Sequence, residues 1–111
     1  MPTLTQLLDI LKLDPEDPVT HFSLAGAYRA AGETEQAMEH YRLATRFKPD
    51  YSAAWFEMAR LAEEQGDVAV AMEAYAGAMT ASSRAGDDHI LNAARVRMRR
   101  LERRQGGSQD V

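Results

Sequence analysis

Residues 52–81 read SAAWFEMARLAEEQGDVAVAMEAYAGAMTA and contain two helical patterns separated by a turn. In the first pattern, Trp55, Met58 and Ala62 recur at intervals of three and four residues, which places them on one apolar helix face. Gly66 interrupts this pattern, and a second helical pattern follows it. Because glycine can adopt the positive φ that closes a helix, the stretch predicts two antiparallel helices joined by a short turn.

The same hairpin occurs twice, because the sequence matches itself when it is shifted by 34 residues. Eight of the 34 aligned positions are identical, whereas average residue usage gives about two identities in unrelated sequence. An internal period of this length is typical of repeat architectures, in which each unit buries its apolar face against its neighbours. The identical pairs are Phe22/Phe56, Ala25/Ala59, Gly32/Gly66, Ala37/Ala71, Met38/Met72, Glu39/Glu73, Tyr41/Tyr75 and Ala44/Ala78.

Both copies resemble the tetratricopeptide repeat (TPR), a hairpin of two helices with small residues at the helix contacts and a closing proline. The resemblance implies an all-α fold, a right-handed TPR superhelix of antiparallel helix hairpins with about six helices. The departures are His21 where the repeat has Trp, Ala62 where it has Tyr, and Ser83 where it has Pro. The matching residues are Leu24, Ala25, Tyr28, Gly32, Ala37, Tyr41, Ala44 and Pro49 in the first copy, and Trp55, Met58, Ala59, Gly66, Ala71, Tyr75 and Ala78 in the second.

A single helix flanks the two repeats at each end. Before the first repeat, a Leu-rich segment follows Thr3, which favours a helix N-cap, and we expect its apolar stripe to cover the first hairpin. After the second repeat, the chain begins like a third repeat but carries Arg100 where the turn glycine belongs, so it predicts one capping helix. Gly77 lies inside the last repeat helix, where it costs about 1 kcal/mol against Ala unless close packing requires it. We therefore predict one domain over residues 1–105, with a flanking helix (4–13), repeat 1 (18–51, helices 18–31 and 34–48), repeat 2 (52–85, helices 52–65 and 68–82) and a capping helix (87–104), followed by a disordered tail (106–111).

Composition and charge narrow the class of protein. The chain has 111 residues, of which 45% are hydrophobic, and a net charge of −4. Residues 1–83 hold 6 Lys/Arg against 13 Asp/Glu, whereas residues 84–111 hold 7 Arg against 4 Asp/Glu. The sequence has no cysteine for a disulfide framework or a thiolate site, and its first residues lack the charged start and apolar run of a signal peptide. We expect a cytoplasmic protein that does not span or bind a membrane.

No group of residues predicts an enzyme. The sequence offers no combination of nucleophile, base and orienting acid, and no glycine-rich phosphate loop. His21 and His89 occupy the repeat position of Trp55, which indicates packing at helix starts. His40 has no second histidine four residues away with which to form a metal pair. We therefore expect no catalysis, cofactor, metal ion or small-molecule substrate.

The TPR resemblance implies a binding groove. In the family, the first helix of each repeat lines a concave surface with repeat positions 2, 5, 9 and 12, and some members clamp a C-terminal carboxylate with Lys and Asn at positions 5, 6 and 9. Three large apolar residues, Phe22, Phe56 and Ile90, recur at one of these positions. The predicted groove residues are Phe22, Gly26, Arg29, Phe56, Arg60, Glu63, Ile90 and Arg97, beside Val19, Ala53 and Ala94. The carboxylate clamp is not expected, because its positions hold Phe22, Ser23, Gly26, Phe56, Glu57 and Arg60.

We predict a non-catalytic protein–protein interaction module that binds a peptide or protein segment in this groove. One alternative is that Phe22 and Phe56 only fill the seam between hairpins. Another is self-association, through the same apolar residues or through an end of the short solenoid. A third is weak binding of an anionic partner by the Arg-rich last helix. That helix has no interleaved aromatic residues to stack on bases, so we do not expect nucleic acid as a partner.

Overall fold

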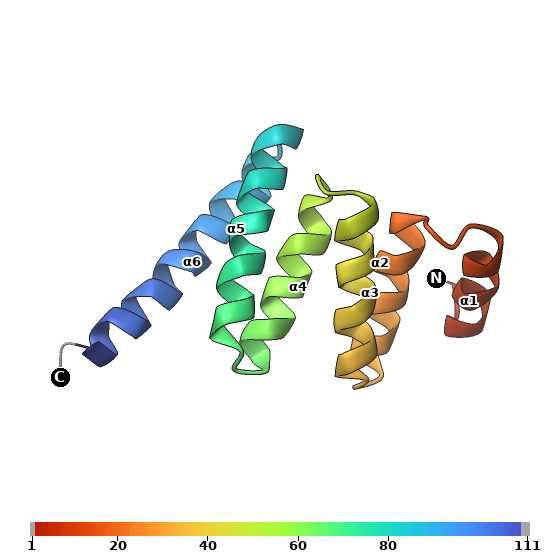
Figure 1. Ribbon diagram of the computed structural model, residues 1–111, viewed down its shortest axis with the longest axis horizontal. Helices are drawn as coiled ribbons and strands as arrows, with labels where there is room; N and C mark the ends of the chain where they lie inside the picture. Colours follow the sequence, from red (N-terminus) through yellow and green to blue (C-terminus); the bar gives the residue numbers. More distant parts are fainter. Residues whose placement is uncertain (1, 110–111) are drawn as a thin grey trace.

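The chain folds into α-helices joined by short turns, and no strand occurs among residues 2–109, which the computed structural model describes, with side chains for residues 2–106. This confirms the predicted all-α solenoid of helix hairpins. The helices are α1 (Leu4–Leu13), α2 (Pro18–Ala30), α3 (Thr34–Phe47), α4 (Ser52–Glu64), α5 (Val68–Ala85) and α6 (Asp88–Gln109) (Figure 1).

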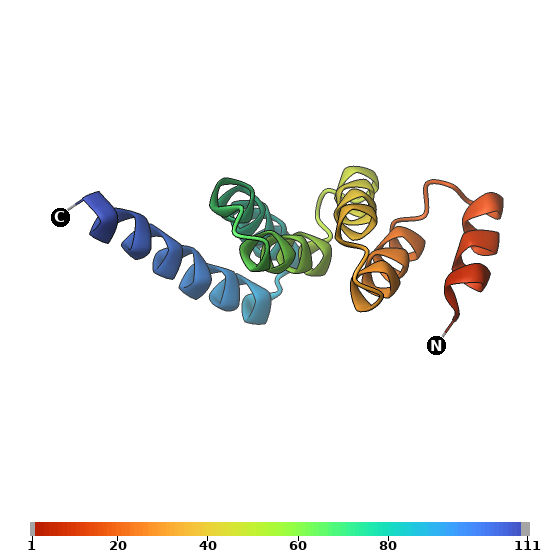
Figure 2. The ribbon, with the colours of Figure 1, turned by 90° about the horizontal axis from the view of Figure 1, so that it is seen from below.

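The helices stack in two layers along one axis. Helices α2 and α3 form one hairpin, α4 and α5 form the next, and α6 packs against α5. Figure 2 shows α2, α4 and α6 in one layer and α3 and α5 in the other. We call the surface of the first layer the inner face and that of the second layer the outer face. The molecule measures 53 × 31 × 20 Å with a radius of gyration of 14.8 Å, above the value of about 13 Å for a compact chain of this length.

Glycines with positive φ close three of the helices. Gly32 and Gly66 have φ of 79° and 77°, and both lie at the turns that the repeat predicts. Gly86, with φ of 73°, ends α5 at Ala85, later than the predicted end at residue 82. The next helix then begins, with the carboxylate of Asp87 accepting a hydrogen bond from the backbone N–H of Ile90 at 3.3 Å. The later end of α5 could have been predicted from the sequence, because Gly86 is a residue that can close a helix.

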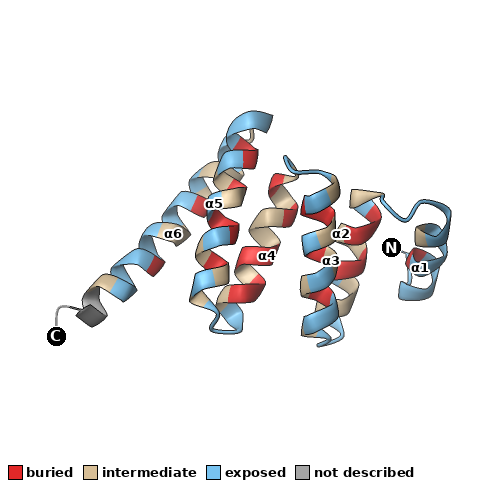
Figure 3. Cartoon of the chain, in the orientation of Figure 1, coloured by how far each residue is buried: buried red, intermediate tan, exposed pale blue. Residues whose placement is uncertain are grey.

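The core is built from alanines at the helix contacts and tyrosines at the seams of the hairpins. Small side chains let the helix backbones approach closely, and the two repeat tyrosines fill the space that remains. Figure 3 shows the buried residues on the sides where neighbouring helices face one another. The repeat residues with at most 2% exposure include Ala25, Ala37, Tyr41, Ala44, Ala59, Ala71, Tyr75 and Ala78.

Gly77 is explained by the ring of Trp55. A Cβ atom at Gly77 would lie 2.5 to 2.8 Å from three atoms of the Trp55 ring, closer than ordinary van der Waals contact. The ring is also fixed at its other edge, where its Nε1–H donates a hydrogen bond to the Pro49 carbonyl at 2.9 Å. Gly77 therefore lets the Trp55 ring pack directly against the backbone of α5. Close packing of this kind was the expected reason for a glycine inside a helix.

The two flanking helices pack to different extents. Thr3 caps α1 in a capping box with Gln6, as its position predicts. The stripe of α1 covers the first hairpin less fully than expected, because Leu7 is buried but Leu4 and Leu8 are each 36% exposed.

At the other end, α6 docks through Ala94 and Leu101, which are 0% and 1% exposed. Helix α6 continues to Gln109, beyond the predicted end at Arg104. Residues 106–109 of the predicted tail are therefore helical, and residues 110–111 lie outside the described residues. The predicted division into domain and repeats stays a prediction.

Candidate peptide-binding face

The three recurring apolar residues lie on successive helices of the inner face, Phe22 on α2, Phe56 on α4 and Ile90 on α6. Each is half-buried. The Phe22 ring packs edge-on against Tyr41 at 5.9 Å and lies 5.1 Å from Tyr51, centroid to centroid. Part of this apolar ladder therefore fills the seam between helices, and the remainder of each side chain faces solvent.

Phe56 is covered further by a guanidinium group. Its ring packs edge-on against Tyr75 at 5.8 Å, and the guanidinium carbon of Arg97 lies 5.7 Å from its centroid. A cation over an aromatic face is attracted by the ring quadrupole, an effect of about 0.5–1 kcal/mol at exposed sites. A partner that contacts Phe56 must therefore share it with Arg97.

Charged residues at the first hairpin junction bind one another. The guanidinium group of Arg29 on α2 donates hydrogen bonds to Glu57, at 2.9 Å, and to Glu64, both on α4. Arg60 donates to Glu57 as well, at 3.2 Å. The side chains of Arg29 and Glu57 are only 21% and 28% exposed, so water screens this pair less than a surface ion pair. This network ties the two repeats together.

A second network centres on Glu63. Its carboxylate accepts a hydrogen bond from the Tyr75 hydroxyl at 2.7 Å and another from Arg100 at 3.2 Å, and it pairs with Arg97 at 3.8 Å. Burial, followed by the hydrogen bond to the Glu63 carboxylate, raises the pKa of Tyr75 to about 12. The network joins α4, α5 and the capping helix α6.

The predicted groove residues thus share one face, but their charges are not free. Arg29, Arg60, Glu63 and Arg97 are all ion-paired. Repeat position 12 holds Arg29, Glu63 and Arg97 in turn, and this alternation of sign is the sequence signal for pairing between repeats. The partners that sequence reasoning missed are Glu57, Glu64, Tyr75 and Arg100.

An open region remains at the start of the inner face. Gly26 is exposed, and a Cβ atom built on it would meet no heavy atom within 4 Å. Val19, about two turns earlier on α2, is 54% exposed. Two further residues were predicted to line the groove. Ala53 is half-buried, and Ala94 of α6 is fully buried. The accessible part of the predicted groove is therefore centred on α2.

His21 on α2 and His40 on α3 form a hydrogen-bonded pair. The Nε2 atom of His21 lies 2.8 Å from the Pro15 carbonyl, and its Nδ1 atom lies 3.0 Å from Nδ1 of His40. Because a carbonyl only accepts, His21 donates through Nε2, and a neutral His21 then accepts the N–H of His40 at Nδ1. Burial, followed by the charge of His21, lowers the pKa of His40. The contact was missed because only spacing within one helix was considered.

The pair supports the packing role predicted for His21, which is 3% exposed and stacks on the His40 ring at 5.2 Å. His89 is exposed, so the packing role predicted for it is wrong. His21 is covered by His40 and Phe47 of the following helix α3, whereas His89 lies on the first turn of α6, the last of the described helices. Among the described residues, no group of three or more His, Cys, Asp and Glu side chains could hold a metal ion. Nor is any described helix long and apolar enough to cross a membrane.

Comparison with known proteins identifies relatives of the repeat. A model of the tetratricopeptide repeat matches residues 18–61. The heat-shock protein cognate co-chaperone sgt12 of Aspergillus fumigatus is 30% identical over 89% of this chain, and the chain spans only 29% of that protein. The TPR repeat-containing protein PA0015 of Pseudomonas aeruginosa is 28% identical over 79% of this chain and 84% of its own length.

A solved structure shares the fold as well. PcrH from Pseudomonas aeruginosa, in complex with the chaperone-binding region of PopD, superposes with a TM-score of 0.85 over 92% of this chain and 77% of its own. Its sequence identity is 16%, so the likeness concerns the fold alone.

Proposed function

Since the chain belongs to the tetratricopeptide repeat family, we propose that it is a non-catalytic interaction module whose inner face binds a segment of another protein. The observation that carries this proposal is the half-exposed ladder of Phe22, Phe56 and Ile90 on successive helices, next to the open surface at Gly26. Aromatic side chains that are partly exposed offer large contact areas at little cost in conformational entropy.

The partner segment contacts apolar side chains more than charges. Arg29, Arg60 and Arg97 already bind carboxylates of this chain, so an acidic partner would have to displace those contacts. One relative is a co-chaperone, which makes a chaperone one candidate partner. With Phe22 and Gly26 in place of clamp residues, such a partner would bind through an internal apolar segment rather than a C-terminal carboxylate.

Gly26 gives a direct test, because its side of α2 opens into free space. Gly26→Trp should fill the groove without a clash, and Gly26→Ala is its matched control. Both replace a helical glycine and should raise the free energy of unfolding by about 0.5–1 kcal/mol. Peptides selected from a displayed library against the full chain should bind Gly26→Ala as well as the native protein and lose most of their affinity for Gly26→Trp.

The proposal fails if the selected peptides bind Gly26→Trp and the native protein equally. It also fails if the selection yields no inner-face binder. Urea unfolding monitored by circular dichroism distinguishes a blocked groove, which leaves the free energy of unfolding intact, from a damaged fold, which lowers it.

Self-association is a second candidate, supported by α1. Leu8, Ile10 and Leu13 on α1, at one end of the solenoid, are 36%, 42% and 87% exposed. If this end pairs with a second copy, the mass measured by light scattering rises with concentration and falls in the variant Leu8→Gln/Ile10→Gln. A monomer at high concentration excludes it. The cytoplasmic location stays a prediction, which fractionation of cells expressing the native protein would test.

A further inference from the structure

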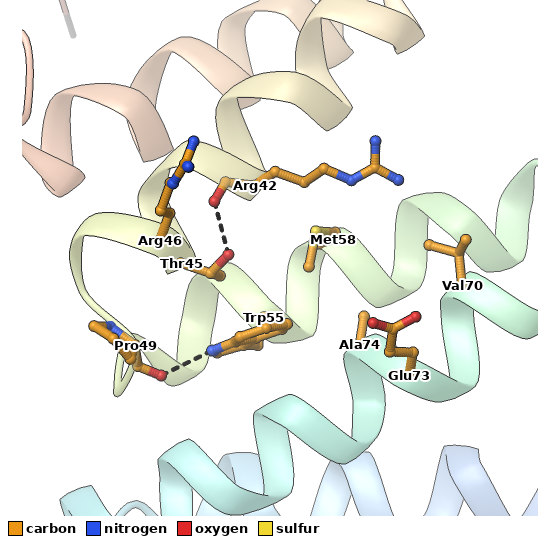
Figure 4. A pocket seen from close by; sticks show the side chains of 9 residues that line it. All are labelled: Arg42, Thr45, Arg46, Pro49, Trp55, Met58, Val70, Glu73 and Ala74. Carbon is orange, nitrogen blue, oxygen red and sulfur yellow. Dashed lines mark hydrogen bonds between the residues drawn. The ribbon is translucent and has the colours of Figure 1, made fainter.

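A groove runs along the outer face between α3 and α5, with α4 as its floor. Two adjoining hollows of about 420 and 260 Å³ make up this outer groove, and both are lined by Arg42 and Val70. The first lies over Trp55 and Met58 (Figure 4), and the second reaches the turn at Asp67. The groove therefore follows much of α4, a helix of 13 residues and hence about 20 Å long.

Its floor is apolar and held in place. Met58 is 5% exposed, and Ala74 on the α5 side is 1% exposed. The Trp55 ring is fixed by its hydrogen bond to the Pro49 carbonyl and by its contact with Gly77. Figure 4 shows Trp55 and Met58 side by side on α4, below Arg42 and Arg46 of α3. A partner would find this floor already formed, which lowers the entropic cost of binding.

The α3 wall of the groove carries two arginines whose guanidinium groups have no partner among the described residues. Arg42 and Arg46 lie one turn apart on α3, both exposed. Among the described residues, no ion pair and no hydrogen bond holds either guanidinium group, in contrast to Arg29 on the inner face. On the opposite wall, Glu73 of α5 also lines the first hollow (Figure 4), and Glu35 and Asp67 line the other end of the groove. The α3 wall is thus basic towards Pro49, where two arginines face one carboxylate, and the groove is acidic towards the turn between α4 and α5.

We infer that the outer groove binds an amphipathic helix of a partner protein, a second interaction surface beyond the proposed one on the inner face. The helix carries two carboxylates one turn apart that pair with Arg42 and Arg46, and an apolar side chain that rests on Trp55 and Met58. Lys or Arg near its other end faces Glu35 and Asp67. Acidic residues are favoured at a helix N-terminus and basic ones at the C-terminus, so its N-terminus lies towards Pro49.

A second copy of this chain fits the outer groove less well. Helix α1 exposes apolar residues such as Leu13, but it holds a single carboxylate, Asp9. Helix α3 has the matching order of charges, with acidic residues first and basic residues later. However, its exposed positions are polar, so it offers no apolar side chain to rest on the floor of the groove. These positions are Glu35, Gln36, Glu39, Arg42 and Arg46.

The test uses the full chain and a displayed library of helix-forming peptides of about 16 residues, long enough to span the groove. Selected peptides should include a class with two carboxylates four residues apart next to a Leu, Met or aromatic residue. Their binding should shift the fluorescence of Trp55, the only tryptophan in the sequence. Arg42→Gln/Arg46→Gln should raise their Kd about tenfold at low salt, whereas the control Arg99→Gln/Arg103→Gln on α6 should not change it.

Charge reversal gives a second, independent readout. Arg42→Glu/Arg46→Glu should lose the acidic peptides and bind versions in which Lys replaces both carboxylates. The Gly26→Trp variant should leave this class of peptide unaffected, which separates the outer groove from the inner face. The inference is overturned if no such class is selected, if charge reversal is not rescued, or if the peptides compete at the inner face. It is also overturned if light scattering shows a dimer that Arg42→Glu/Arg46→Glu dissociates, since the occupant is then a second copy.

Discussion

The contact between Gly77 and Trp55 predicts an unusual response to a substitution that normally stabilises helices. Gly77→Ala in the interior of α5 should by itself gain about 1 kcal/mol from helix propensity. The new Cβ atom, however, would lie 2.5 to 2.8 Å from three atoms of the indole ring. The ring must move by about 1 Å to restore normal contact. Such overpacking typically costs about 1–3 kcal/mol.

The cost is increased by the anchor on the other edge of the ring. The hydrogen bond from Trp55 to the Pro49 carbonyl is 2.9 Å long, and a shift of that size weakens or breaks it, at about 1 kcal/mol. The sum of these effects makes Gly77→Ala destabilising by about 1–3 kcal/mol. In the background of Trp55→Ala the clash is absent, so the same substitution should stabilise by about 1 kcal/mol.

The assay is a double-mutant cycle measured by urea unfolding with circular dichroism. The free energies should show a coupling between the two positions of about 2–4 kcal/mol. In the single Gly77→Ala variant, tryptophan fluorescence should also shift, because it reports Trp55 alone. The reasoning is refuted if Gly77→Ala stabilises the chain while Trp55 is present, or if the coupling is smaller than about 0.5 kcal/mol.

Three further predictions follow from the backbone and the titratable groups. Gly66→Val should destabilise by about 2 kcal/mol or more, because a β-branched residue resists the φ of 77°, whereas Gly26→Ala should stabilise in the same urea assay. Because the folded state lowers the pKa of His40, the unfolded chain binds more protons, so stability should fall as pH drops below about 6.5; the His40→Phe variant should show a weaker slope between about pH 7 and 5. Because the folded state raises the pKa of Tyr75 to about 12, stability should fall as pH rises above about 10. Burial also raises the pKa of Tyr41 and Tyr51, so ultraviolet titration should show several tyrosines that ionise late, and the signal near pH 12 should be absent in Tyr75→Phe.

The helices and turns could be predicted because their signals are local. The positive φ of Gly32 and Gly66, and the N-cap at Thr3, each depend on a few neighbouring residues. The same holds for the position of the apolar ladder, since a period of 34 residues places Phe22 and Phe56 on equivalent helices. Where local signals competed, the prediction was less accurate. Helix α5 runs past its predicted end at residue 82 to the end of the repeat at Ala85, where Gly86 closes it.

Pairings between helices could not be predicted, because they depend on how neighbouring helices are rotated. His21 and His40 are 19 residues apart, and Arg29 and Glu64 are 35 apart. Neither spacing is a contact distance within one helix, nor a simple multiple of the repeat. The alternation of Arg29, Glu63 and Arg97 signals that charges pair, but the further partners of Glu63 follow only from the structure.

The outer groove is made mainly of residues that break the repeat, which bears on how function is distributed in this chain. Shifting by 34 residues replaces Arg42 with Ala76 and Arg46 with Thr80, and it sets His21 against Trp55. The alanines shared by both copies, such as Ala37 and Ala71, lie at the buried helix contacts. The repeat thus sets the scaffold and the spacing of the inner-face residues Phe22 and Phe56, whereas departures from it create a charged, apolar-floored groove at the junction of α3, α4 and α5. The inner face and the outer groove also differ in the kind of contact from which a partner gains binding energy. Inner-face charges are already neutralised within the chain, so a partner there gains mainly from apolar contact. Arg42 and Arg46 of the outer groove are exposed and have no ion-pair partner among the described residues, so a partner there gains from charge, and its affinity should fall as salt is added.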